Sequence, residues 1–205
     1  SYPKPSKHCD AGNLDLLKKY AARNREKDKM QKTSKKMKRV VAANKEWFQT
    51  LENHSVQLLY GLTRHLDNSS PHDAYARLLA KFVENDCEKC DRMVELCLKY
   101  DIKMRQAEYR YYKSDEAEEA EENGVDVDLA ALNAKLEGGG DLFHRISVVI
   151  AFAAQGSKRC HEYILDQLRT QNSGIGVIKA AIEEFVSILD EGEHREQLEK
   201  YLLLI

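Results

Sequence analysis

The segment from Arg77 to Tyr100 contains two helical hydrophobic patterns that are separated by only three polar residues. In the first pattern, Leu78 and Phe82 recur with the spacing of one helix face. Residues 84–86 interrupt this pattern, and Asp86 can cap the helix that follows. The apolar positions of this second helix are Cys90, Met93, Val94, Cys97 and Tyr100. Because two helices joined so tightly bury little surface by themselves, the segment predicts one unit of a stacked helical array.

The rest of the chain shows the same helical periodicity. Only three prolines and ten glycines occur in 205 residues, and no segment alternates apolar and polar residues for long enough to predict a sheet. Further helices are predicted over residues 40–51, 56–66, 71–83, 87–113, 127–136, 142–154, 158–170 and 175–189, with a last helix that ends at Ile205. Helix pairs with short connections and no strict repeat length favour degenerate armadillo or HEAT-type repeats. We therefore expect an all-α helical-repeat solenoid.

Several connections carry specific signals. Ser70-Pro71 is typical of a helix start, residues 138–140 are all glycine and predict a turn, and Asp141 can cap the next helix. The helix after Asp141 is apolar on nearly all sides, which predicts that several neighbours cover it. Its residues Ile146, Val149, Ile150 and Phe152 are expected to be buried among Ile164, Ile178, Ile182 and Phe185.

Charge is distributed unevenly along the chain. Residues 1–50 contain fourteen Lys and Arg against five Asp and Glu, whereas residues 114–205 contain eight against nineteen. A basic start and an acidic end indicate charged partners, or a contact between the two ends. Together with the helical pattern this predicts four regions: a basic, partly flexible segment over 1–39, helical repeats over 40–113, an acidic linker with a short helix over 114–140, and C-terminal repeats or a cap over 141–205.

Composition also bears on compartment. No window approaches the roughly 18 apolar residues of a membrane span, and no apolar stretch near Ser1 is typical of a signal peptide. Five cysteines, an odd number without a framework spacing, favour a reducing compartment. We expect no association with a membrane.

The motifs that could support catalysis or metal binding are weak. Cys87-x-x-Cys90 suggests zinc or redox chemistry, but zinc needs two more ligands, and no second Cys-x-x-Cys pair occurs in the sequence. We therefore favour a packing role for both cysteines and expect no metal or cofactor. The three glycines at 138–140 lack the preceding strand and the following Lys-Ser/Thr of a phosphate loop. The sequence predicts no catalytic residues and no enzyme.

The sequence around the tight connection resembles a known family. Leu-Leu-x-Lys-Phe-x-Glu-Asn-Asp-x-Glu-Lys-x-Asp-Arg over 78–92, followed by Glu-Leu-x-x-Lys-Tyr over 95–100, is similar to β-catenin-like proteins. These are armadillo-repeat nuclear proteins of the splicing machinery. Weaker similarity extends through 35–40, 58–66 and the helices after Asp141, while residues 114–140 match poorly. The resemblance covers most of this chain and only the C-terminal part of the family's chain, so it implies the last repeats and cap of an armadillo solenoid.

This resemblance also implies a function. The family suggests a non-enzymatic scaffold in the nucleus that binds basic, nuclear-localisation-type segments of splicing proteins. The acidic residues available to receive such a segment are Glu183, Glu184, Asp190, Glu191 and Glu193, with the acidic run over 115–128. The repeats expected to form the central groove lie upstream of this chain, so its role can also be that of a capping or oligomerisation module, including a homodimer.

A basic cluster supports a further alternative. Lys35, Lys36, Lys38 and Arg39 form a short run that is typical of a nuclear import signal or a phosphate-backbone contact. Such runs also occur as solvated faces of helices. A contact with RNA or a ribonucleoprotein through this N-terminal segment therefore remains open.

Overall fold

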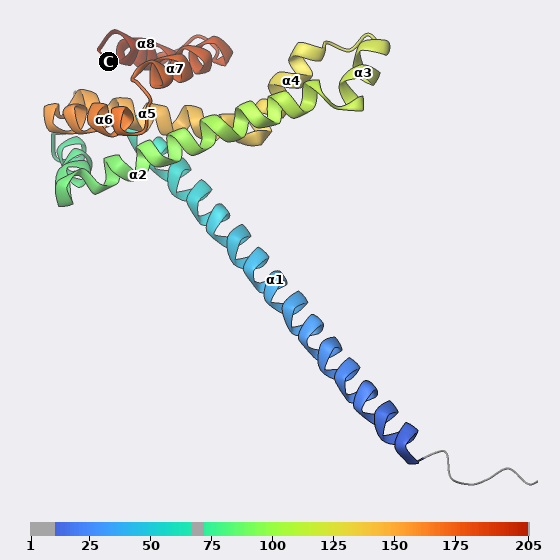
Figure 1. The fold of residues 1–205 in the computed structure, drawn as a ribbon. Helices are drawn as coiled ribbons and strands as arrows, with labels where there is room; N and C mark the ends of the chain where they lie inside the picture. The colour runs from blue at the N-terminus through green and yellow to red at the C-terminus, as the bar shows by residue number, and fades with distance from the viewer. Residues whose placement is uncertain (1–10, 67–71, 205) are drawn as a thin grey trace, which may run out of the picture. The chain divides into compact units, whose positions relative to one another are not determined.

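The computed structural model describes the backbone of residues 11–66 and 72–204, and the side chains within these ranges from Lys36 onward, except that of His72. All regular elements within these ranges are helices, which confirms the all-α prediction (Figure 1). They are α1 (Ala11–His65), α2 (His72–Tyr112), α3 (Asp115–Glu122), α4 (Val127–Lys135), the wide helical turn η1 (Leu136–Gly140), α5 (Asp141–Gly156), α6 (Lys158–Thr170), α7 (Gly176–Ile188) and α8 (Glu193–Leu204). None of the described helices is long and apolar enough to cross a membrane. The predicted start at Ser70-Pro71 lies outside the described residues.

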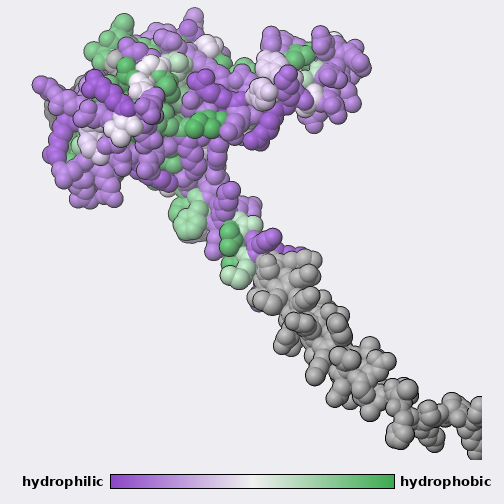
Figure 2. All heavy atoms as spheres, in the orientation of Figure 1, coloured by the Kyte–Doolittle hydropathy of each residue, from purple (hydrophilic) through white to green (hydrophobic). Residues whose placement is uncertain are grey.

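The chain forms two compact units, Ser1–Glu52 and Asn53–Ile205. Helix α1 runs through the boundary without interruption, so the predicted division into helices at 40–51 and 56–66 is wrong. The reason is local: residues 52–55 include neither glycine nor proline, and their polar side chains do not end a helix by themselves. In the first unit, Trp47 and Phe48 are exposed and their rings meet edge to face, with centroids 5.0 Å apart. Figure 2 shows a group of hydrophobic residues on α1.

Helix α2 consists of two helical segments joined at the predicted connection. Glu84 is extended, and the next three residues are left-handed, with φ of 51° at Asn85, 53° at Asp86 and 63° at Cys87. Asparagine and aspartate tolerate this conformation better than most residues, which is why the break falls there. The predicted capping role of Asp86 is wrong because an N-cap residue has an extended backbone. Its carboxylate instead accepts a hydrogen bond from Arg159 of α6 at 2.7 Å.

Helix α5 is the centre of the second unit. It contacts α2, α6, α7 and α8, and Figure 1 shows α7 and α8 on one side of it. The predicted core is confirmed, since all eight residues named for it are at most 8% exposed: Ile146, Val149, Ile150, Phe152, Ile164, Ile178, Ile182 and Phe185. The expected cap at Asp141 is wrong. That residue is already helical, and its carboxylate accepts a hydrogen bond from Arg145 one turn later.

In the connection before α5, the backbone of two glycines lies very close to α2. A Cβ atom on Gly138 would lie 2.2 Å from Cβ of Ala107, and one on Gly139 would lie 2.7 Å from the Tyr100 ring. Gly139 also has a φ of 125°, which side chains rarely permit. The predicted turn at 138–140 is therefore confirmed as a break in helical backbone, although the helical path resumes at once in α5.

Candidate functional site

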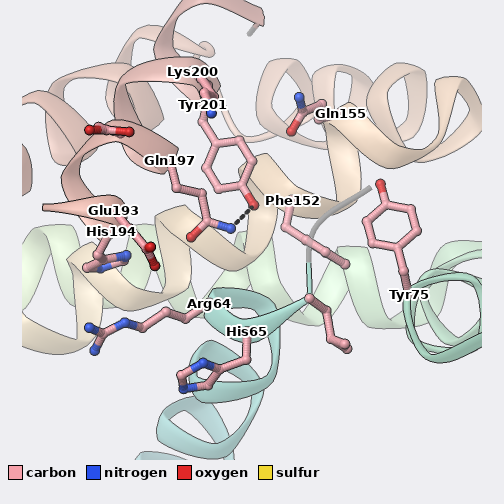
Figure 3. A pocket seen from close by; sticks show the side chains of 12 residues that line it. Arg64, His65, Tyr75, Phe152, Gln155, Glu193, His194, Gln197, Lys200 and Tyr201 are labelled. Carbon is pink, nitrogen blue, oxygen red and sulfur yellow. Dashed lines mark hydrogen bonds between the residues drawn. The ribbon is translucent and has the colours of Figure 1, made fainter. Parts of the chain in front are cut away.

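A pocket of about 740 Å³ lies in the second unit, where the C-terminal end of α1 meets α5 and α8 (Figure 3). Arg64 and His65 come from α1, Tyr75 comes from α2, and Phe152 and Gln155 come from α5. Helix α8 contributes Glu193, His194, Glu196, Gln197, Lys200 and Tyr201. The sequence analysis did not identify this pocket, because its residues come from four helices and show no motif along the chain.

Polar contacts hold the wall of the pocket that α8 forms. The Gln197 amide donates to the Tyr201 hydroxyl at 3.2 Å, the contact drawn in Figure 3, and to the Thr63 carbonyl of α1 at 3.4 Å. The Tyr60 hydroxyl and His194 Nε2 are 2.5 Å apart. On the opposite wall, the rings of Tyr75 and Phe152 meet edge to face at 5.3 Å. The pocket therefore has an aromatic wall and a polar wall that is fixed by hydrogen bonds.

The pocket carries both signs of charge. Glu193 and Glu196 are exposed on α8, and Arg64 and Lys200 are exposed beside the same cavity. Burial lowers the pKa of His194, and the positive charge of Arg64 lowers it further, so this imidazole is neutral near pH 7. Aromatic walls and carboxylates together suit the aliphatic stem and the charged end of a lysine or arginine side chain.

Four of the five predicted acidic residues lie in solvent. Glu183 is exposed on α7, Asp190 and Glu191 are exposed in the turn after it, and Glu193 begins α8 and lines the pocket. Figure 1 shows α7 and α8 next to each other, joined by this turn. The structure thus places one predicted acidic residue at the pocket and two in the turn that leads to it.

Glu184 is different, because its carboxylate is already paired inside the unit. One of its oxygens accepts from Lys135 of α4 at 2.5 Å, and the other lies 3.4 Å from His144 Nε2. Burial by itself raises the pKa of Glu184, but Lys135 and His144 together lower it below its usual value. His144 is 1% exposed and stacks on Phe185 with ring centroids 5.3 Å apart, and its burial lowers its pKa. Glu184 therefore joins α7 to α4 and α5.

The other predicted charged groups are spread over separate elements. Lys36, Lys38 and Arg39 are exposed on α1 in the first unit, while the side chain of Lys35 lies outside those described. In the acidic run over 115–128, all eight carboxylate residues are exposed on or next to α3 and α4. Asp126 caps α4 by accepting from the backbone of Asp128 and Leu129, and Asp128 accepts from the Tyr112 hydroxyl at 3.0 Å.

Three cysteines form the one group of potential metal ligands in the described part of the chain. The Sγ atoms of Cys87, Cys90 and Cys160 lie within 4.8 Å of one another, and all three residues are buried. Burial raises the pKa of the Cys87 and Cys90 thiols, and the neighbouring Cys160 adds to this effect. The sequence analysis treated Cys87-x-x-Cys90 without Cys160, because only the packing of α6 against α2 brings the third thiol to the pair.

Comparison with known proteins agrees with the helical-repeat fold. The family described as "Catenin-beta-like, Arm-motif containing nuclear" matches residues 21–183. Beta-catenin-like protein 1 of Mus musculus is 27% identical over 180 residues, which is 85% of this chain and 31% of the relative. The Homo sapiens protein of the same name is 28% identical over 178 residues, 84% of this chain and 30% of the relative. The chain thus spans about a third of the length of the curated relatives that it matches.

Proposed function

The chain belongs to the catenin-beta-like family of Arm-motif containing nuclear proteins, and from this premise we propose that it is a non-enzymatic scaffold of the pre-mRNA splicing machinery. Its binding partners in this proposal are basic, nuclear-localisation-type segments of splicing proteins. Catalysis is not part of the proposed role, because proteins of this kind act by presenting a rigid curved surface.

The observation that carries the proposal is the exposed acidic edge beside the pocket. We define the acidic edge as Glu183, Asp190, Glu191 and Glu193, all exposed along α7, the following turn and the start of α8. These charges attract a lysine- or arginine-rich segment, and complementary charge raises the association rate and fixes the register of a bound peptide. The pocket then accommodates one basic side chain, whose stem packs against Tyr75 and Phe152.

Glu184 is left out of this edge. Its carboxylate is occupied by Lys135, so reversing its charge would leave a partly buried ammonium group next to another. A loss of binding in that variant would be explained equally well by unfolding of the chain and by loss of a contact with the peptide. The exposed residues of the acidic edge do not have this ambiguity.

Charge reversal tests the proposal. In the triple variant Glu183→Lys/Asp190→Lys/Glu191→Lys, we expect affinity for a fluorescent nuclear-localisation-type peptide to fall by about tenfold or more at physiological salt. The matched control is Asp115→Lys/Glu118→Lys/Glu122→Lys, which changes net charge equally on exposed positions of α3. Fluorescence anisotropy measures both, and circular dichroism checks that both variants remain helical.

The control separates a defined site from diffuse attraction. If both triple variants weaken binding equally, the acidic edge is not the site and attraction depends on total charge alone. If the wild-type chain does not bind the peptide, basic nuclear-localisation-type segments are not the partners of this chain. In that case light scattering of the purified chain tests the alternative, a capping or oligomerisation module.

A second candidate function rests on the exposure of Lys36, Lys38 and Arg39 on α1. These residues could contact the phosphate backbone of RNA, and such binding weakens steeply as salt rises. Replacing all three by glutamine should then abolish salt-dependent RNA binding in a filter assay. RNA binding that is unchanged by this substitution would eliminate the candidate.

A further inference from the structure

Two helix ends meet at the cysteine cluster, Cys87, Cys90 and Cys160. Cys87 is the last of the left-handed residues in the α2 break, and Cys90 follows one turn later. Cys160 lies in the first turn of α6, where its backbone N–H faces the Ser157 cap at 3.4 Å. The ion pair between Arg159 and Asp86, at 2.7 Å, holds the α6 start against the α2 break. The packing of α6 against α2 at this break brings the three thiols together.

The positions of the sulfur atoms are close to those that a metal ion requires. Thiolates that bind one tetrahedral Zn²⁺ at about 2.3 Å lie about 3.8 Å apart. The three Sγ atoms are within 4.8 Å of one another, so each pair needs to close by at most about 1 Å.

The backbone at the cluster is unusual for a simple packing site. A left-handed cysteine is strained, and such strain persists where the surroundings hold it, often at ligand sites. Asp86, directly before Cys87, has a side chain that is 96% exposed, while the three thiols are 0–1% exposed. The cysteine cluster therefore lies just beneath an exposed part of the α2 break.

We propose that Cys87, Cys90 and Cys160 form a trithiolate site for one soft metal ion, Zn²⁺ or Cu⁺. Thiolate ligands select these two ions among the common metals. Binding replaces three S–H bonds by three metal–sulfur bonds and releases three protons, with no change of oxidation state. Among the described residues no fourth His, Cys, Asp or Glu joins the group. The fourth position of Zn²⁺ is then open to water or an external thiol, whereas trigonal Cu⁺ needs no fourth ligand.

This site replaces the expectation that Cys87 and Cys90 only fill the core. Its function is a structural clamp: a bound ion fastens α6 to the break in α2, and it stabilises the second unit by the free energy of binding. The prediction is independent of the proposed peptide binding, since the cysteine cluster and the acidic edge share no residue.

Competition with chelators tests the site. The full chain with Cys9→Ser, reduced and stripped of metal, is titrated with Zn²⁺ against a chromophoric zinc chelator and with Cu⁺ against a copper(I) chelator. We expect one equivalent of one of these ions to bind and the unfolding midpoint to rise with it. Cys160→Ser should weaken binding by at least about 100-fold, because loss of a ligand exceeds the effect of losing a supporting residue.

The chain offers a matched control in Cys97. This thiol is also on α2 and fully buried, but it lies 3.6 Å from Ser147 Oγ, and it is not part of the cysteine cluster. Cys97→Ser should leave metal affinity within about twofold of the parent chain. Cys87→Ser, at the edge of the break, repeats the ligand test in case Cys160→Ser lowers helicity in the metal-free chain.

Two results would overturn the proposal. One is the absence of stoichiometric binding of either ion to the reduced chain, and the other is an equal loss of affinity in Cys97→Ser and Cys160→Ser.

Discussion

Phe152 shows how one side chain connects the core to the pocket. It is 2% exposed, its ring meets Tyr75 at 5.3 Å, and it lines the pocket beside α8. We expect Phe152→Ala to lower the free energy of unfolding by about 3–5 kcal/mol, because truncation removes buried apolar surface and leaves a cavity. Urea denaturation measures this loss. Tyr109→Ala, at a position 65% exposed, is the control and should change stability by less than about 0.5 kcal/mol.

His144 makes stability depend on pH. Burial lowers its pKa below 6.5, against the opposing effect of Glu184, so the folded chain binds this proton less readily than the unfolded chain. Below pH 6.5 the unfolded state therefore gains protons first, and the free energy of unfolding falls with a slope of at most about 1.4 kcal/mol per pH unit for this group. His194, whose pKa is also lowered, acts in the same direction.

Substitution isolates the contribution of His144. In His144→Gln, the decline in stability between pH 7 and pH 5, measured by thermal unfolding, should be shallower than in the parent chain. His54→Gln, at an exposed position of α1, is the histidine control. A pH profile that is equally steep in His144→Gln would contradict the account, whatever the absolute stability of that variant.

At the level of elements, the sequence predicted a helix break correctly where its residue types tolerate the backbone conformation that the break requires. Glu84-Asn85-Asp86 is a polar interruption between two apolar patterns, and Asn85 and Asp86 tolerate left-handed backbone, so sequence and structure coincide there. The polar residues at 53–55 looked similar but are helical, because a capping residue ends a helix only if the tertiary structure turns the chain away. Sequence therefore located one break correctly and placed another where none exists.

Gly139 offers a test of the close packing between η1 and α2. Its φ is 125°, and an added Cβ would meet the Tyr100 ring at 2.7 Å. Gly139→Ala should lower the free energy of unfolding by about 1–3 kcal/mol through backbone strain and displacement of the ring. Gly176→Ala, in α7 with open space around the added Cβ, should be neutral or slightly stabilising. Chemical denaturation of both variants makes the comparison, and equal effects would show that the close approach to Tyr100 is unimportant.

At the scale of the whole molecule, the sequence predicted the core better than the sites. Apolar periodicity fixes which faces turn inward, and for this reason Ile146, Ile150 and Ile182 were assigned correctly. The pocket and the cysteine cluster arise only when helices distant in sequence pack together, as Cys160 does with Cys87. Periodicity in a single sequence holds no information about that pairing. Glu184 was predicted to be available to a basic partner, but in the structure it pairs with Lys135 of another helix.

The division into two units predicts unequal effects of truncation. Removing residues 1–35 should leave the unfolding midpoint of the second unit nearly unchanged, because that unit begins at Asn53. Removing residues 193–205 should instead abolish cooperative unfolding, since α8 contributes the buried Leu198 and Tyr201 to the core and His194 to the contact with Tyr60. Calorimetry of the two shortened chains makes the comparison. A sharp transition after loss of α8 would contradict this account.

Two hydrogen-bonded contacts that join α8 to α1 can form only late in the synthesis of this segment. Tyr60 and His194, like Thr63 and Gln197, are separated by 134 residues. A ribosome adds roughly 5–20 residues per second, so the end of α1 waits on the order of ten seconds before its partners exist. The second unit therefore gains these two contacts only after α8 has been made.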